Sequence, residues 1–311
     1  MPCTKLFVGY KAAELAPEDL TDDTLVHVLD IYHQHAIEKV FPRSRVVCSA
    51  HLPEGDWREV RFRTGPKLMS GELALDLYQE CLAAVKGDLK RVKLEYIGRE
   101  RDRNDLIDKV KARADRRFRA EWPASVPGGR KLSFTSYPGC FCHRRLDEGG
   151  LALAEVVTKR MEKEKGKGEN GQGVKILDMG CGCGLVGLLI ADFFRQSKVS
   201  LTLIDSHARA VEAAKENAAK FQLPAEVILS DDGLGSSTRA YDLFVGNPPY
   251  YSDYRIAEVF LETARKNLKS GGVCYTVCKN AAGLEPVQKR YFPTVEILSR
   301  RGYAVLRSVK S

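Results

Sequence analysis

The sequence has 311 residues, more than one typical domain needs, so two domains are expected. Its hydrophobic content of 44% and charged content of 29% are ordinary for a soluble globular protein. No apolar run approaches the about 18 residues that a membrane span requires, and residues 1–30 lack the pattern of an export signal. A cytoplasmic location is therefore expected, and the net charge of +8 favours an anionic partner, with nucleic acid as the first candidate.

The nine cysteines are scattered through apolar or glycine-rich surroundings, so reduced thiols are expected. Two Cys-x-Cys pairs occur, at Cys140 and Cys142, followed by His143, and at Cys181 and Cys183. Neither pair has the Cys-x-x-Cys spacing of a structural zinc site, so no metal is expected.

The N-terminal half combines helix and strand patterns. Apolar positions from Leu25 to Ile37 recur near helical spacing, which predicts a helix opened by Pro17 and Asp19. Strands are expected at 45–50 and 92–97, and a helix at 72–85. Residues 98–119 interleave Arg and Lys with Asp, which fits either a solvated helix with ion pairs or a surface that contacts RNA.

Proline and glycine cluster at 123–129, which predicts an interdomain linker. The expected domains are 1–130, with a role in RNA binding, and 131–311. Residues 159–173 are rich in glycine and charge and poor in apolar residues, so a mobile loop is expected there.

From Val174 onward, short apolar runs alternate with amphipathic helical segments. This alternation predicts a parallel sheet with helices on both faces. The expected strands are 174–179, 200–205, 226–230, 241–247, 272–278, 294–299 and 303–309, and the expected helices are 185–194, 208–221 and 256–268. Because only three residues separate the last two strands, they are expected to form an antiparallel hairpin.

The strand at 174–179 continues directly into GlyCysGlyCysGly at 180–184. Glycines allow a tight turn and close approach of a ligand at the carboxyl edge of such a sheet. Asp205 ends the next strand, where its carboxylate can accept hydrogen bonds from both ribose hydroxyls. The sequence therefore predicts a nucleoside-containing cofactor at this edge.

A nicotinamide dinucleotide is one candidate, because Gly182, Gly184 and Gly187 have the G-x-G-x-x-G spacing. Asp178 argues against it. A carboxylate immediately before the loop would repel a pyrophosphate, whereas it would attract a cationic amino group on the ligand.

AsnProProTyr at 247–250 follows the fourth expected strand. Two consecutive prolines fix φ and lack N–H donors, so the local carbonyls stay available. The Asn247 side-chain oxygen and the Pro248 carbonyl can accept both hydrogens of one exocyclic amine, whose lone pair can then attack a methyl carbon. Tyr250 offers a flat face for a flipped-out base. A surface turn is the alternative, but the position beside a glycine loop favours a catalytic site.

These motifs resemble those of the class I methyltransferases that use S-adenosyl-L-methionine (SAM) to modify amino groups. The matching segments are LeuAspMetGlyCysGlyCysGly (177–184), LeuIleAsp (203–205), SerAsp (230–231) and AsnProProTyr (247–250). The resemblance implies that the loop region holds the methionine part, Asp205 the ribose, and Asp231 or Asp232 the adenine amine. The implied cofactor-binding residues are Asp178, Gly180, Cys181, Gly182, Gly184, Asp205 and Asp231, and the implied catalytic residues are Asn247, Pro248 and Tyr250.

A finer resemblance is to the bacterial guanine-N2 methyltransferases of small-subunit (16S) ribosomal RNA. It rests on TyrProGlyCysPheCysHisArgArgLeuAspGluGlyGly (137–150) and on ValCysLysAsnAla (277–281) in the tail. That family has a degenerate methyltransferase-like N-terminal domain before the active one. The chain departs from it in two ways: the family usually has Phe where Tyr250 stands, and this N-terminal half is short for a complete second domain.

The expected fold is α/β, with a Rossmann-like seven-stranded class I methyltransferase domain and a smaller α+β N-terminal domain. The expected function is methylation of guanine N2 in ribosomal RNA, with RNA or the ribosomal subunit as partner. The alternatives are N6-adenine methylation of RNA or DNA, glutamine N5 methylation of a protein, and an RNA-binding protein with a relic SAM pocket. The sequence does not determine the oligomeric state.

Overall fold

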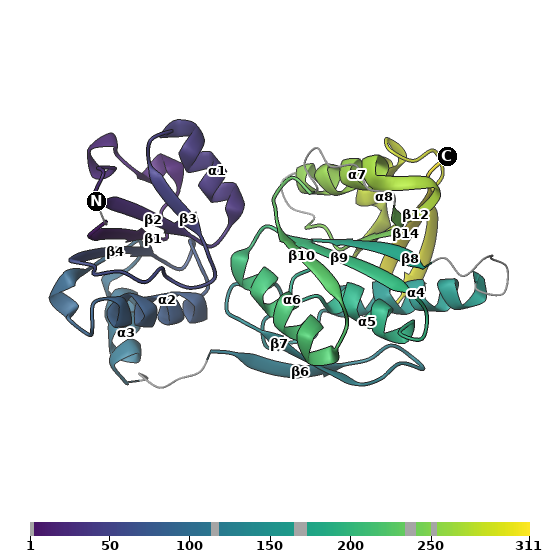
Figure 1. Ribbon diagram of the computed structural model, residues 1–311, viewed down its shortest axis with the longest axis horizontal. Coiled ribbons are helices and arrows are strands. Elements are labelled where there is room, and N and C mark those ends of the chain that lie inside the picture. Colours follow the sequence, from purple (N-terminus) through teal and green to yellow (C-terminus); the bar gives the residue numbers. More distant parts are fainter. Residues whose placement is uncertain (1–2, 113–117, 165–172, 234–240, 250–253) are drawn as a thin grey trace. The chain divides into compact units, whose positions relative to one another are not determined.

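The computed structural model describes residues 3–112, 118–164, 173–233, 241–249 and 254–311, and Figure 1 traces their helices and strands. Contacts within the chain define two compact units. Unit 1 is Met1–Ala120 together with two short later segments, Tyr137–Cys140 and His207–Arg209, and unit 2 is the remainder. The division falls at Ala120 instead of at the expected boundary near residue 130.

Unit 1 is built on a five-stranded sheet in the order β3-β2-β1-β4-β5, with every neighbouring pair parallel. The strands are β1 (Lys5–Val8), β2 (Thr24–Val28), β3 (Arg45–Cys48), β4 (Glu59–Thr64) and β5 (Val92–Tyr96). Figure 1 shows α1 (Ile31–Val40) on one face of this sheet and α2 (Gly71–Ala84) and α3 (Glu100–Ala112) on the other. Because the sheet is all parallel and the helices alternate with its strands, unit 1 is α/β, which corrects the expected α+β class.

The predicted helix over Leu25–Ile37 is wrong in its first half. Thr24–Val28 is a central strand, and α1 begins only after Asp30, whose side chain accepts a hydrogen bond from the Tyr32 N–H at 2.9 Å. Val26 and Val28 are buried. A short run that is buried on both sides has no strand alternation, so its spacing alone cannot distinguish a strand from a helix.

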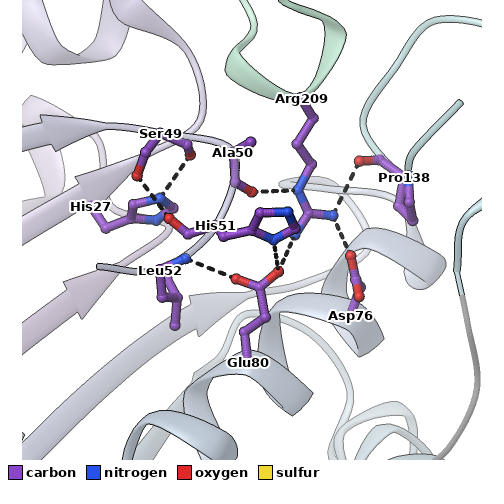
Figure 2. A network of polar contacts seen from close by, with 9 residues as sticks. All are labelled: His27, Ser49, Ala50, His51, Leu52, Asp76, Glu80, Pro138 and Arg209. Atoms are coloured by element: carbon purple, nitrogen blue, oxygen red, sulfur yellow. Dashed lines mark hydrogen bonds and ion pairs between the residues drawn. The ribbon is translucent and has the colours of Figure 1, made fainter. Parts of the chain in front are cut away.

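The buried guanidinium of Arg209 contacts several segments of unit 1 (Figure 2). Arg209 is 1% exposed and forms ion pairs with Asp76 and Glu80, both on α2. Its Nε donates to the Ala50 carbonyl at 2.9 Å, and its guanidinium also donates to the Pro138 carbonyl at 3.3 Å. A buried guanidinium requires partners of this kind, because an unpaired buried charge is strongly destabilising.

The predicted linker at 123–129 is wrong. Pro123 lies in β6 (Ala120–Ala124), which pairs with β7 (Leu132–Ser136) in a separate two-stranded sheet. Gly128, with φ of 78°, lies in the connection between the two strands. Proline and glycine here mark an edge strand and a turn, two other positions that favour them.

Unit 2 contains the expected seven-stranded sheet, in the order β10-β9-β8-β11-β12-β14-β13. Its strands are β8 (Val174–Met179), β9 (Val199–Asp205), β10 (Ala225–Leu229), β11 (Tyr241–Gly246), β12 (Leu268–Cys278), β13 (Glu296–Arg300) and β14 (Tyr303–Val309). The first five strands of this order are parallel to one another, and β14 runs antiparallel to β12 and β13. The predicted parallel sheet with a terminal hairpin is confirmed.

Helices cover both faces of this sheet (Figure 1). Three lie on one face: α4 (Glu148–Glu164), α5 (Leu185–Phe193) and α6 (Ala208–Phe221). The other face carries α7 (Arg255–Asn267) and α8 (Ala281–Lys289). Because α4 continues to Glu164, the prediction of a loop from residue 159 is wrong for 159–164, and residues 165–172 lie outside the described ranges.

The core of unit 2 follows from residue spacing. On α7 the residues Ala257, Phe260, Leu261 and Ala264 are buried, which is the i, i+3, i+4, i+7 stripe of a helix packed on a sheet.

All nine cysteines carry free thiols. Among the described helices, none combines the length and the apolar character needed to cross a membrane.

Candidate active site

The parallel register of unit 2 brings the predicted site residues to one edge of the sheet. The last residue of β8 pairs with the penultimate residue of β9 and with the last residue of β11. Gly180, Asp205 and Asn247 follow these paired positions, so they lie in a row at the carboxyl edge. Leu229 of β10 pairs with Asp205, which places Asp231 beyond the end of the next strand.

The loop after β8 depends on glycine. Gly180, Gly182 and Gly184 have φ values of 66°, 56° and 86°, a region that other residues rarely adopt. A Cβ added at Gly180 would lie 2.6 Å from the Phe260 ring, so no side chain fits there. The Cys181 N–H donates to the Ile204 carbonyl at 2.9 Å and ties the loop to β9.

Two carboxylates support this loop. Asp205 accepts a hydrogen bond from the Gly182 N–H at 2.8 Å, and Asp178 accepts one from the Gly187 N–H at 2.8 Å. Asp178 is 1% exposed. Burial, together with the nearby charge of Asp205, raises the pKa of Asp178 to about 7. Asp178 therefore lies beneath the loop, where it holds the first turn of α5.

Of the two acidic candidates after β10, Asp231 is half-buried and Asp232 is exposed. The Asp232 carboxylate already accepts a hydrogen bond from the Ser230 hydroxyl at 2.7 Å. The Ser230 N–H donates to the Asp205 carbonyl at 3.0 Å, so this segment is attached to the end of β9.

Asn247 and Pro248 lie at the carboxyl end of β11, half-buried and buried, respectively. The Asn247 amide nitrogen donates to the Asp147 carboxylate at 2.8 Å. Tyr250, the third predicted catalytic residue, lies outside the described residues.

Asp147 is a site residue that the sequence reasoning missed. It immediately precedes α4, where its other oxygen accepts a hydrogen bond from the Gly149 N–H at 3.0 Å. Burial raises the pKa of Asp147, opposed by hydrogen bonds from Gly150, Asn247 and Gly149 that favour the ionised form. An Asp before two glycines and a helix is a local signal for a helix start, but no local pattern identifies a partner 100 residues away.

Several further polar residues make contacts within the fold. His143 bonds through Nδ1 to the Ser136 hydroxyl at 3.0 Å, and no group of three possible metal ligands occurs in the described parts of the chain. His207 is half-buried and belongs to unit 1. Asn280 caps α8 by accepting a hydrogen bond from the Ala282 N–H at 3.1 Å, and the Lys279 ammonium lies 4.2 Å from the centre of the Tyr303 ring.

Comparison with known families gives a match to the methyltransferase small domain over residues 131–307. This range contains six strands of the large sheet, most of β14 and every residue of the candidate site.

Among curated proteins, the chain is 29% identical over 184 residues to ribosomal RNA small subunit methyltransferase C of Haemophilus influenzae (strain PittGG). It is 30% identical over 184 residues to the protein of that name from Pseudomonas entomophila (strain L48). Each alignment covers 58% of this chain, but only 52% and 51% of the respective relative. The chain thus spans about half the length of the curated relatives that it matches.

Among solved structures, the fold resembles that of the T. thermophilus 16S rRNA N2 methyltransferase (RsmC), determined in complex with AdoMet and guanosine. The TM-score is 0.77 at 17% sequence identity, and the superposition covers 99% of this chain and 88% of the other. At this identity the likeness establishes the fold alone, and it extends over both units.

Proposed function

The chain belongs to the methyltransferase small domain family, and from this premise we propose that it transfers a methyl group from SAM to the N2 amine of a guanine in ribosomal RNA. The observation that carries the proposal is the position of Asn247, next to the glycine loop and Asp205 at one sheet edge. The names of the curated relatives and the guanosine bound by the structural neighbour support the choice of ribosomal RNA and of guanine.

The residues at this edge fit SAM. We assign the methionine part to the loop of Gly180, Cys181, Gly182 and Gly184 with Asp178 behind it, the ribose to Asp205 and the adenine amine to Asp231. The left-handed loop supports this assignment, because a Cβ at Gly182 would meet none of the described protein atoms within 4 Å and the backbone there is open to a ligand. When bound, SAM supplies an electrophilic methyl group.

The proposed catalysis consists of positioning. The Asn247 side-chain oxygen and the Pro248 carbonyl accept the two hydrogens of the target amine, which directs its lone pair along the line of attack. The methylated amine carries a positive charge and is acidic, so it loses a proton to water without a dedicated base. We assign to Tyr250 the stacking of the target base.

For unit 1 we propose a degenerate copy of the methyltransferase fold that contacts RNA. The shared strand order supports the first part, and the exposed arginines Arg99 and Arg101 at the start of α3 support the second. If Arg101 contacts a phosphate, Arg101→Glu raises KM for RNA and reduces its salt dependence while leaving kcat unchanged. Because ribosomal RNA is a cytoplasmic substrate, the proposal also implies a cytoplasmic location.

The direct test is incubation with methyl-labelled SAM and separate pools of ribosomal RNA, transfer RNA, DNA and cell protein. We expect label in ribosomal RNA, recovered after digestion as N2-methylguanosine. Label in N6-methyladenosine or in protein would retain the cofactor and overturn the substrate, and no label in any pool would point to a binding protein with a relic pocket.

Asn247→Ala tests the proposed centre. Loss of a preorganised hydrogen-bonding group at a reacting atom typically lowers kcat by about 10²–10³-fold. We expect a loss of this size with the Kd for SAM within about twofold of wild type, measured by calorimetry. Normal turnover in this variant would refute the assignment of Asn247.

A further inference from the structure

The feature from which the inference starts is the pair formed by Asp147 and Asn247. The two Asp147 oxygens have separate partners: Oδ1 accepts from the Gly149 N–H at 3.0 Å, and Oδ2 accepts from the Asn247 amide at 2.8 Å. The carboxylate therefore connects the first turn of α4 to the segment that follows β11. This contact is independent of the cofactor loop, because neither partner belongs to it.

The local sequence is adapted to this contact. A Cβ added at Gly150 would lie 2.6 Å from Asp147 Oδ2, and one added at Gly149 would lie 3.1 Å from the Tyr303 ring. Side chains at these two positions would displace the carboxylate or the ring. The GlyGly pair thus leaves room for Asp147 to reach Asn247 while it caps the helix.

The chemistry of the pair determines which way the Asn247 amide faces. An ionised carboxylate only accepts hydrogen bonds, so it must be the NH₂ group of Asn247 that faces Asp147. The amide oxygen then faces the opposite way. In the reverse orientation two acceptors would meet at 2.8 Å, and the NH₂ group would confront the hydrogens of an incoming amine.

We propose that Asp147 is a positioning residue, which fixes the Asn247 amide so that its oxygen accepts a hydrogen from the target amine. The inference rests on the proposed function, since it assumes a planar amine as substrate. Fixing the amide before the substrate arrives removes the need to select one of two orientations at each turnover. Asp147 also caps α4 through Oδ1, which accepts from the Gly149 N–H.

The test compares two single variants. In Asp147→Asn the new side chain has a single acceptor oxygen, and the Gly149 N–H binds it. The NH₂ group of the new amide therefore faces residue 247. The Asn247 amide then turns its oxygen towards residue 147 and away from the substrate. We expect kcat to fall by about 10²-fold with the Kd for SAM within about twofold of wild type. Asp147→Ser is the matched control for capping, since serine caps helices well but is too short to hold Asn247. It should fold normally and also lose turnover.

The exchanged pair Asp147→Asn with Asn247→Asp provides the rescue. Here the Asn at 147 donates to the carboxylate at 247, whose second oxygen accepts from the substrate, so we expect kcat within about tenfold of wild type, as for a pair in which every hydrogen bond is satisfied. Asn247→Asp alone places two carboxylates face to face, so one must hold a proton. Its activity should therefore rise as pH falls, whereas the exchanged pair should keep the wild-type pH profile.

All variants are assayed with the acceptor that the wild-type protein labels. Wild-type kcat in Asp147→Asn would reduce Asp147 to a helix cap and overturn the inference, as would a folded exchanged pair no more active than Asp147→Asn. If the wild-type protein transfers the methyl label to adenine or glutamine, guanine is refuted as the target, and the inference is tested on that amine instead. A wild-type protein that labels no acceptor would refute the proposed function, and this inference with it.

Discussion

The two units have the same scaffold but different edges. The five strands of unit 1 are all parallel, and their order matches that of the first five strands of unit 2, β10-β9-β8-β11-β12. After β8 come three left-handed glycines, whereas after β1 comes one, Gly9, where a Cβ would lie 2.3 Å from the Arg63 carbonyl. The segment after β11 begins with Asn247, whereas the segment after β4, the corresponding strand of unit 1, begins with Gly65 and Pro66.

The differences between the two units therefore lie in the segments that follow the strands. Unit 1 has a cavity of about 510 Å³ at the carboxyl ends of β4 and β5, lined by Thr64, Pro66, Tyr96 and Asp102 among others. At its own sheet edge unit 2 carries the glycine loop, Asp205 and the Asn247 amide. Function in such folds lies in the residues carried at the edge.

The largest effect is expected in unit 1, on stability. Arg209→Leu leaves the Asp76 and Glu80 carboxylates without their buried cation, and breaking one side of a buried ion pair costs about 3–5 kcal/mol. Urea denaturation of the full chain measures the change. Arg209→Lys should lose less, because it retains the charge without the fork of the guanidinium. An unchanged midpoint in the leucine variant would contradict the network.

The second prediction contrasts an aspartate at the end of β9 with one that lies two residues after β2. Asp205→Ala removes the proposed ribose acceptor, and loss of hydrogen bonds to a charged group corresponds to about 10- to 100-fold weaker binding. Asp30→Ser, after β2, keeps a cap for α1 and should leave the Kd for SAM unchanged. Calorimetry with SAM distinguishes the two. Equal losses in both variants would mean that unit 1 also binds the cofactor.

The third prediction concerns pH and Asp178. Since burial raises its pKa to about 7, the free protein holds a proton at Asp178 below that pH, and this proton opposes pairing with the ammonium of SAM. Affinity should therefore fall by up to about tenfold per pH unit below 7. Stability without cofactor should change in the opposite sense, decreasing as pH rises from 3.8 to about 7. Titrations at pH 6 and 8 test this, and equal Kd values would refute it.

The smallest predicted effect is the loss of stability on removing a helix cap, which should be equal in the two units. Ser70 caps α2 by accepting from the Leu73 N–H at 3.3 Å, and Asn280 caps α8. Replacing either by alanine should cost about 1 kcal/mol without changing SAM binding. If Asn280→Ala weakened RNA binding with no loss of stability, Asn280 would be an RNA contact and not a cap.

How far the sequence predicted the structure depended on local pattern. The strand Val174–Met179 and the helix Ala208–Phe221 are observed with the predicted bounds, because a short, mainly apolar run and a clear helical face are local signals. The sequence analysis did not predict the strand Glu59–Thr64, although its half-buried Glu59, Arg61 and Arg63 alternate with buried residues, a pattern typical of a strand. Asp147 could not be found from spacing, since its role depends on Asn247, 100 residues away.

The position of Arg209 late in the chain also affects when unit 1 can complete its folding during synthesis. Asp76 and Glu80 receive their shared cation from a residue 133 positions after Asp76 in the chain. A nascent chain that has completed all five strands of unit 1 still lacks the Arg209 guanidinium that pairs with these two carboxylates. Unit 1 therefore reaches its final form only after synthesis has passed the cofactor loop and β9, instead of folding fully as an independent first domain.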